Sequence, residues 1–215
     1  MQITSRGCRG ISVTKGINLD ITNRCLLQCS KCSRTLNMGL TKQGGEMSPE
    51  SMHKICQYYS DISFCGQRGD PIYHPKFIEL LEICNHYDLE HLEINTNGTG
   101  KSPEWWKKAA LINLDYNWIF ALDGLPHQSH LYRVNQDGEQ VFKIMKYLRR
   151  FGVRVYWRYI AFRYNENSIE EAKELAKKHR INFELVVSSR WDGPNDPLRP
   201  INPELSRIRD DYVKT

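Results

Sequence analysis

Residues 19–32 read LDITNRCLLQCSKC, and this stretch decides the fold that the sequence indicates. It begins inside a short apolar and β-branched run, residues 16–22, which predicts a strand. Three cysteines, Cys25, Cys29 and Cys32, follow within eight residues at the spacing CxxxCxxC. Thiols crowded into a loop after a strand are typical of a metal centre, because soft thiolates bind iron–sulfur clusters and zinc.

Short strand-like runs alternate with helical patterns along the rest of the chain. The further predicted strands cover residues 61–65, 91–95, 118–122, 153–161 and 182–187; predicted helices begin at Ser48 and Ser102 and cover residues 74–87, 138–151 and 168–180. This alternation predicts an α/β fold with a parallel sheet. Six strands are too few for a closed eight-stranded barrel, so we expect a single domain built as a partial (β/α)6 TIM-like barrel.

The chain organisation follows from the same pattern. We expect an N-terminal segment at residues 1–15, a core at 16–190, and a tail at 191–215 that contains four prolines and covers the barrel. The composition is that of a globular protein, with 40% hydrophobic and 26% charged residues, and no segment has the length of apolar sequence that a membrane span needs. The first residues lack the apolar core of a secretory signal, so we expect a cytoplasmic protein.

The basic residues form no concentrated patch along the sequence. The net charge of +5 is spread along the chain and interleaved with acids. A nucleic-acid interface usually carries a dense basic stripe, so we expect nucleic acid not to be a partner.

Every distinctive loop follows the carboxyl end of a predicted strand. The cysteines follow the first strand, residues 66–71 the second, 96–98 the third and 123–133 the fourth. In parallel α/β proteins the chemistry lies at this edge of the sheet, so we expect these four loops to meet there.

The three clustered cysteines leave two kinds of metal centre open. On a four-iron cluster, three thiolates leave one iron without a protein ligand. A structural zinc site would need a fourth ligand, for which the sequence offers Cys8 or His53 at unusual spacing.

The strand followed by CxxxCxxC resembles the radical S-adenosylmethionine (radical SAM) superfamily, in particular its peptide- and protein-modifying members and the molybdopterin-precursor synthases. The resemblance implies one [4Fe–4S] cluster on Cys25, Cys29 and Cys32 and S-adenosylmethionine chelated to the open iron. It implies reductive cleavage of that cofactor to methionine and a 5′-deoxyadenosyl radical, which abstracts hydrogen from a substrate.

The resemblance extends over residues 15–190 and implies cofactor-binding positions in the other loops. The loop with Gly66, Gly69 and Asp70 is similar to the family's Gly-Gly-Glu-Pro loop, with Gln67 and Arg68 inserted and aspartate in place of glutamate. Thr96 and Asn97 match the Thr-Asn-Gly end of strand three. Asp123 belongs to a Leu-Asp-Gly match in which Ala121 replaces serine, and His130 and Arg133 follow at the family's spacing. In relatives that arginine pairs with the cofactor carboxylate.

The sequence leaves the roles of two positions open. Arg158 alternates with apolar residues along the fifth predicted strand, so it points either into the barrel toward the cofactor or outward into solvent. The family often places an aromatic residue before the last cluster cysteine, near adenine. Lys31 stands there in this chain, so another group has to pack against adenine, and residues 187–189 are candidates.

No cysteine follows Cys84, so we expect one cluster and no cysteine-rich auxiliary domain in this chain. The resemblance favours a peptide, protein or small-molecule substrate and implies a flavodoxin- or ferredoxin-like electron donor. Modification of a nucleotide or nucleic acid is a second enzymatic hypothesis. A non-catalytic iron–sulfur electron carrier or binding protein is a third hypothesis, although such carriers usually shield the cluster with four cysteines.

Overall fold

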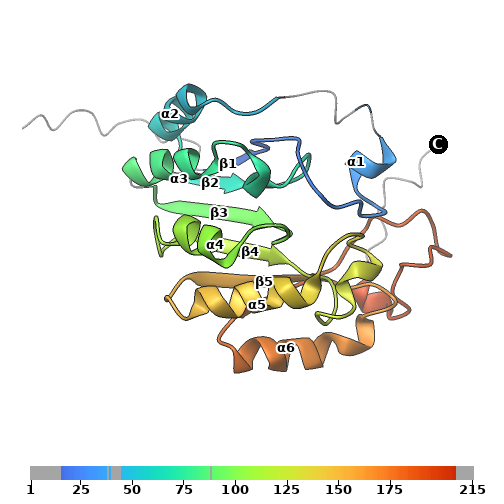
Figure 1. The fold of residues 1–215 in the computed structure, drawn as a ribbon. Helices are drawn as coiled ribbons and strands as arrows, with labels where there is room; N and C mark the ends of the chain where they lie inside the picture. Colours follow the sequence, from blue (N-terminus) through green and yellow to red (C-terminus); the bar gives the residue numbers. More distant parts are fainter. Residues whose placement is uncertain (1–15, 38, 40–44, 88, 207–215) are drawn as a thin grey trace, which may run out of the picture.

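The computed structural model describes residues 16–37, 39, 45–87 and 89–206. Its six strands are β1 Gly16–Leu19, β2 Asp61–Phe64, β3 His91–Thr96, β4 Asn117–Ala121, β5 Arg154–Ile160 and β6 Asn182–Val186. They form one parallel sheet in the order of the sequence, with β1 and β6 at its two edges (Figure 1). This confirms the predicted α/β fold with an open parallel sheet.

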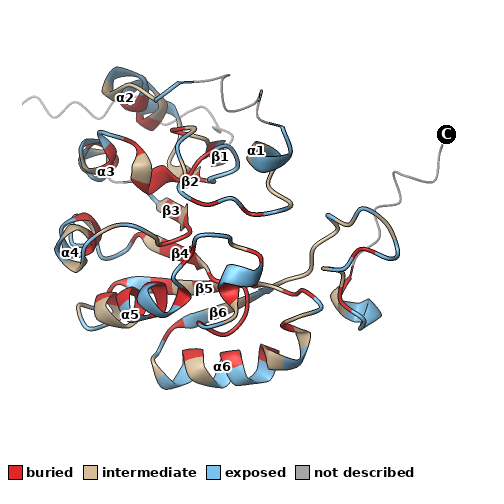
Figure 2. Cartoon of the chain, turned by 45° about the vertical axis from the view of Figure 1, so that its right-hand side comes forward, coloured by how far each residue is buried: buried red, intermediate tan, exposed pale blue. Residues whose placement is uncertain are grey.

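The helices are α1 Ser33–Leu36, α2 Pro49–Tyr58, α3 Phe77–His86, α4 Pro103–Ala110, α5 Gly138–Arg149 and α6 Ile169–Lys178. Figure 2 shows α2, α3, α4 and α5 along one side of the sheet, with α6 beside β6. In Figure 1 the strand arrows point toward α1 and the segment after β6, so these lie at the carboxyl edge of the sheet. The predicted segment 1–15 and the end of the predicted tail, residues 207–215, fall outside the described residues.

Side-chain caps explain where α2 and α4 begin. Ser48 Oγ accepts a hydrogen bond from Ser51 N at 3.2 Å, and Ser102 Oγ accepts one from Trp105 N at 3.2 Å. Each serine is followed by a proline in the first helical turn, as the sequence predicted. The helix predicted for residues 74–87 is α3, which begins later, at Phe77, and is preceded by a separate 3₁₀ turn at residues 71–73.

The strands divide the molecule into an apolar side and a polar side. On β3, Leu92 and Ile94 are buried under the helices, whereas Glu93 and Asn95 on the other face are half-buried. On β5, Trp157 is buried in the same core and its neighbour Arg158 is half-buried. Since successive side chains of a strand point to opposite faces, the face away from the helices carries the polar groups.

Among the described residues, no helix has the length and apolar composition that crossing a bilayer requires.

We predict that Trp106→Ala destabilises the protein by about 3–5 kcal/mol, the usual cost of removing a buried aromatic side chain. Trp106 on α4 is fully buried and packs against Trp118 and Phe120 of β4, with ring centroids 5.5 and 5.1 Å apart. Trp105→Ala on the same helix is the matched control, because Trp105 is only half-buried and its loss should cost less. Urea unfolding measures both, and equal losses would contradict the packing described here.

Candidate functional site

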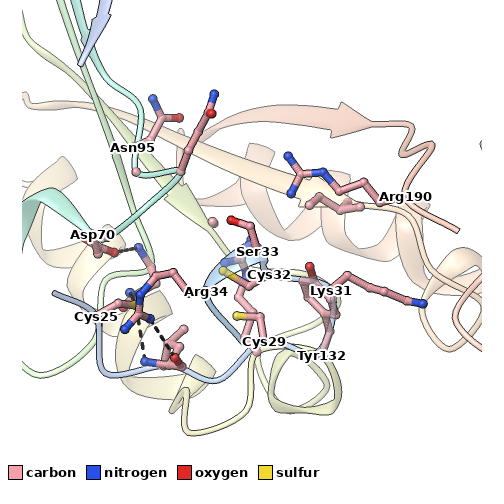
Figure 3. Close-up of a pocket in the computed structure, with 18 of the residues that line it drawn as sticks. Cys25, Cys29, Lys31, Cys32, Ser33, Arg34, Asp70, Asn95, Tyr132 and Arg190 are labelled. Atoms are coloured by element: carbon pink, nitrogen blue, oxygen red, sulfur yellow. Dashed lines mark hydrogen bonds between the residues drawn. The ribbon is translucent and has the colours of Figure 1, made fainter. Parts of the chain in front are cut away.

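A cavity of about 670 Å³ opens at the carboxyl edge of the sheet. Its walls come from the cysteine loop, from the loops after β2, β3 and β4, and from residues 189–192 of the segment after β6 (Figure 3). The predicted site residues that line it are Cys25, Cys29, Cys32, Gly66, Gly69, Asp70, Thr96, Asn97, Arg133 and Arg158. Asp123 and His130 are not among the lining residues: Asp123 is buried behind the wall and His130 is exposed.

The cysteine loop presents its three thiols to this cavity. Cys29 is buried, and Cys25 and Cys32 are partly buried. A turn closed by the Cys32 N–H donating to Cys29 O at 3.0 Å leads into α1, a helix that the sequence did not predict. The loop is attached to the opposite wall, since Gln28 N donates to Val134 O at 3.2 Å.

The surroundings of Cys25 and Cys29 favour the neutral form of these two thiols. Burial raises the pKa of Cys25 to about 11, and the nearby Asp70 carboxylate adds to the effect. Burial also raises the pKa of Cys29, although the positive charge of Arg133 opposes it. Metal ligation requires thiolates, so binding a metal here would release protons.

Asp70 joins the loop after β2 to the end of β3. Its Oδ1 accepts hydrogen bonds from Ile72 N at 3.2 Å and Thr96 Oγ1 at 3.0 Å, and its Oδ2 accepts one from Asn97 N at 2.5 Å. Burial raises the pKa of Asp70 to about 6, although these donors favour the anion. The carboxylate therefore organises the wall of the cavity from within.

The same loop contacts the cysteine loop through its backbone. Asp70 N donates to Arg24 O at 2.8 Å. At Gly69 an added Cβ would lie 2.3 Å from Thr22 O and 2.8 Å from Arg24 N. Only glycine permits this approach, so the second glycine of the predicted loop is a packing requirement between the two loops.

Arg133, which is half-buried, and the fully buried Asp123 form an ion pair beyond the end of β4. Arg133 Nε lies 2.7 Å from Asp123 Oδ2, and Asp123 Oδ1 accepts a hydrogen bond from Ile160 N at 2.8 Å. Burial alone would lower the pKa of Arg133, but the Asp123 carboxylate outweighs it and raises that pKa. Arg133 is therefore a charged guanidinium in the cavity wall. Asp123 does not line the cavity itself but fixes the position of Arg133.

Arg158 points to the polar face, which answers the question that the sequence left open. Its Nε donates to Glu184 Oε2 at 2.9 Å, and its guanidinium also contacts Asn95 and Glu93. Arg154, at the opposite end of β5, is exposed and pairs with Asp115 at 2.6 Å. The cavity therefore receives Arg158, whose charge is already balanced by carboxylates.

Sequence reasoning missed the groups that surround the cysteine loop. Lys31 pairs with Asp192 and with the buried Asp196, which lies 2.6 Å from its Nζ. Cys29 belongs to a small apolar cluster whose rings are Tyr132, Phe162, Tyr164 and Trp191. Tyr132 and Phe162 are 4.4 Å apart between ring centroids. These contacts join distant parts of the chain, and the proline content of the tail was the one signal that pointed to them.

A second missed group is Gln136, which is buried behind the cavity. Its Nε2 donates to Asn97 O at 2.7 Å and to Ala121 O at 3.0 Å. Its Oε1 accepts from Ser129 Oγ, which in turn accepts from Asp123 N at 3.0 Å. This network fixes the ends of β3 and β4 relative to each other.

The residues considered for a zinc site are not gathered with the three thiols. Cys8 lies outside the described residues, and His53 on α2 contacts Tyr87 Oη at 3.2 Å and does not line the cavity. In the described part of the chain, no three His, Cys, Asp or Glu side chains converge closely enough for one metal ion. A [4Fe–4S] cluster does not need such convergence, because each thiolate binds a different iron.

Fold and cavity together define an α/β protein with a thiol-lined site at the carboxyl edge of an open parallel sheet. The family model described as the Radical SAM superfamily matches residues 19–176. The chain therefore belongs to the radical SAM superfamily, whose members bind a [4Fe–4S] cluster and S-adenosylmethionine and have a partial TIM-barrel fold.

Each relative matches part of this chain, and this chain spans from about a quarter to about half of the length of each relative. A probable GTP 3′,8-cyclase from Methanothermobacter thermautotrophicus is 33% identical over 86 residues, which is 39% of this chain and 27% of that protein. The structure of anSMEcpe with bound AdoMet shares the fold, with a TM-score of 0.64 and 15% identity over 86% of this chain and 55% of that one. Streptococcus suis SuiB bound to precursor peptide SuiA has a TM-score of 0.67 and 16% identity over 81% of this chain and 39% of that one.

The residues present fit this pair of cofactors. The three thiols are the soft ligands that iron–sulfur clusters take, and they face a cavity that also receives a charged arginine and a buried carboxylate. The thiols therefore suit a cluster, and the arginine and the carboxylate suit a zwitterionic ligand bound in the same cavity.

We predict that Gly69→Ala weakens the association of the two loops and destabilises the protein by roughly 1–3 kcal/mol, because a methyl group overlaps the backbone of residues 22–24. Gly45→Ala is the matched control, since an added Cβ there meets no atom within 4 Å. Thermal unfolding of both variants provides the measurement. A Gly69→Ala protein as stable as Gly45→Ala would contradict the close approach.

Proposed function

We propose that this protein holds one [4Fe–4S] cluster on Cys25, Cys29 and Cys32, and that it cleaves S-adenosylmethionine reductively to methionine and a 5′-deoxyadenosyl radical that takes hydrogen from a substrate. The observation that carries the proposal is that the three thiols and the loops after β2, β3 and β4 line one cavity. The bound cofactors would supply hydrogen abstraction, which no amino-acid side chain provides by itself.

In this proposal the residues of the chain bind and orient the two cofactors. The three thiolates anchor the cluster and leave one iron for the second cofactor. Arg133 offers its outer guanidinium nitrogens to a carboxylate, since its Nε already faces Asp123. The loop of Gly66, Gly69 and Asp70 offers backbone oxygens and a carboxylate to an amine, while Thr96, Asn97 and Arg158 complete the polar wall.

The packing around the thiols supports exclusion of water from the reaction. Leu27, Tyr132 and Phe162 are buried beside Cys29, and Trp191 packs against them from the segment after β6. We propose that this segment, the start of the predicted tail, covers the cavity and keeps solvent from a reactive radical.

The substrate we propose is a peptide, a protein or a small metabolite. SuiB, which shares the fold, has been captured with its precursor peptide SuiA. Nucleotide modification is the second candidate, favoured by the local identity to a probable GTP 3′,8-cyclase. A flavodoxin- or ferredoxin-like protein is the electron donor we propose, with the cytoplasm as the compartment.

The first test is production of 5′-deoxyadenosine by protein reconstituted anaerobically with iron and sulfide, reduced with dithionite and given S-adenosylmethionine. We expect release of 5′-deoxyadenosine, measured by chromatography, and its loss to background in Cys25→Ala, Cys29→Ala and Cys32→Ala. Cys56→Ala is the matched control, because this buried thiol lies on α2 and is absent from the cavity wall, so it should keep activity.

Two outcomes would contradict the proposal. Near-normal 5′-deoxyadenosine from any one of the three variants would remove that cysteine from the cluster. A protein with a full cluster that releases none, even with peptide or nucleotide substrates added, would favour an electron carrier or binding protein.

We predict that Arg133→Ala weakens binding of S-adenosylmethionine to the reconstituted protein roughly tenfold or more, as expected for loss of a charge-assisted hydrogen bond. The cluster absorbance should remain, since Arg133 is not a ligand. Asp123→Asn should weaken binding in the same direction, because it releases the guanidinium that Asp123 holds. Isothermal titration measures both, with the exposed Arg154→Ala as control. Unchanged affinity in Arg133→Ala would exclude it from the binding site.

A further inference from the structure

The side chain of Asn97 is held in one orientation by its surroundings. Asn97 lies just after β3 and is 5% exposed, and its backbone N–H donates to Asp70 Oδ2 at 2.5 Å. The backbone carbonyl oxygen of Asn97 accepts a hydrogen bond from Gln136 Nε2 at 2.7 Å. Backbone contacts on both sides therefore fix where the side chain begins.

The amide group itself is oriented by a third contact. Asn97 Oδ1 accepts a hydrogen bond from Thr99 N at 2.9 Å. Because a backbone N–H only donates, the oxygen of the amide has to face Thr99, and the NH₂ group has to face the other way. That other side is Cys25, whose Sγ lies 3.5 Å from Asn97 Nδ2.

Cys25 Sγ receives a second donor from its own loop. Leu27 N donates to it at 3.4 Å. One sulfur of the three-cysteine set therefore accepts two N–H groups. One comes from the backbone, and the other comes from a residue that Asp70, Gln136 and Thr99 hold in place.

The chemical consequence concerns the cluster and rests on the proposed function. Reduction adds an electron whose charge is shared with the ligand sulfurs. N–H donors to those sulfurs stabilise the more negative, reduced state, so they raise the reduction potential. Removing such a donor makes the cluster harder to reduce.

We infer that Asn97 is a positioning residue of the cluster, whose amide N–H to Cys25 Sγ sets the reduction potential. Asn97 then acts on the cluster through Cys25, in addition to the contact with S-adenosylmethionine that the resemblance of its loop implies. Thr99, Asp70 and Gln136 then act on the cluster indirectly, by holding the amide in this orientation.

The test is an anaerobic redox titration of the reconstituted protein, followed by electron paramagnetic resonance of the reduced cluster. At a fixed solution potential, we expect Asn97→Ala to lower the ratio of reduced to oxidised cluster roughly two- to tenfold, the range for loss of one hydrogen bond. Asn97→Asp should lower the ratio further, because it keeps the acceptor for Thr99 N but replaces the donor with a negative oxygen.

The control is Asn113→Ala, which removes an asparagine outside the cavity. Asn113 Oδ1 accepts from Asp115 N at 2.9 Å, as Asn97 Oδ1 accepts from Thr99 N, but its Nδ2 donates to Asn85 Oδ1 and not to a thiol. We expect its titration curve to match the wild type. If Asn97→Ala fails to fold or to take up iron, the redox titration of the near-isosteric Asn97→Asp is compared with that of the wild type instead.

The outcomes separate this inference from the proposed function. Asn97 variants with wild-type potentials, in a protein that still releases 5′-deoxyadenosine, would overturn the inference and leave the proposed function standing. Lowered ratios in a protein that loads its cluster but never cleaves S-adenosylmethionine would support the inference and refute the proposed catalysis. A wild-type chain that takes up no cluster would refute both.

Discussion

The candidate site depends on one buried carboxylate. Asp70 accepts hydrogen bonds from the ends of two different loops, while its backbone N–H reaches the cysteine loop at Arg24 O. Three segments that are far apart in sequence thereby share one small volume. Removing a carboxylate from water is unfavourable, and only the full set of donors makes its burial tolerable. The loops therefore have to assemble together, which is how an open sheet acquires a defined cavity.

Three cationic side chains that line this cavity already face carboxylates of the protein. Arg133 faces Asp123, Arg158 lies between two glutamates, and Lys31 meets two aspartates of the segment after β6. A guanidinium whose charge is balanced from behind still presents free donors in front, and its position is fixed. The site thus combines strong donors with low mobility, as recognition of a zwitterionic ligand requires.

Local patterns predicted the elements and the loops well, because they depend on residues close together in sequence. Ser48 and Ser102 cap helices where expected, and ten of the predicted site residues line the cavity because parallel strands end at a common edge. Spacing did not reveal that Asp123, a predicted cofactor-binding residue, lies buried behind the cavity wall against Arg133. The sequence showed only that Lys31 stands where relatives often have an aromatic residue. Its ion pairs with Asp192 and Asp196 join distant parts of the chain, so no local pattern predicted them. Gln136 likewise looks ordinary in sequence and is specified only by three-dimensional contacts.

The contact between Lys31 and Asp192 joins residues 161 positions apart. During synthesis at roughly 5–20 residues per second, the cysteine loop therefore waits on the order of ten seconds or more before its acidic partners are made. Throughout that interval the thiols belong to a nascent chain whose cavity lacks one wall. The cysteine loop is thus synthesised early and its acidic partners late, so the loop stays accessible until the segment after β6 has been made.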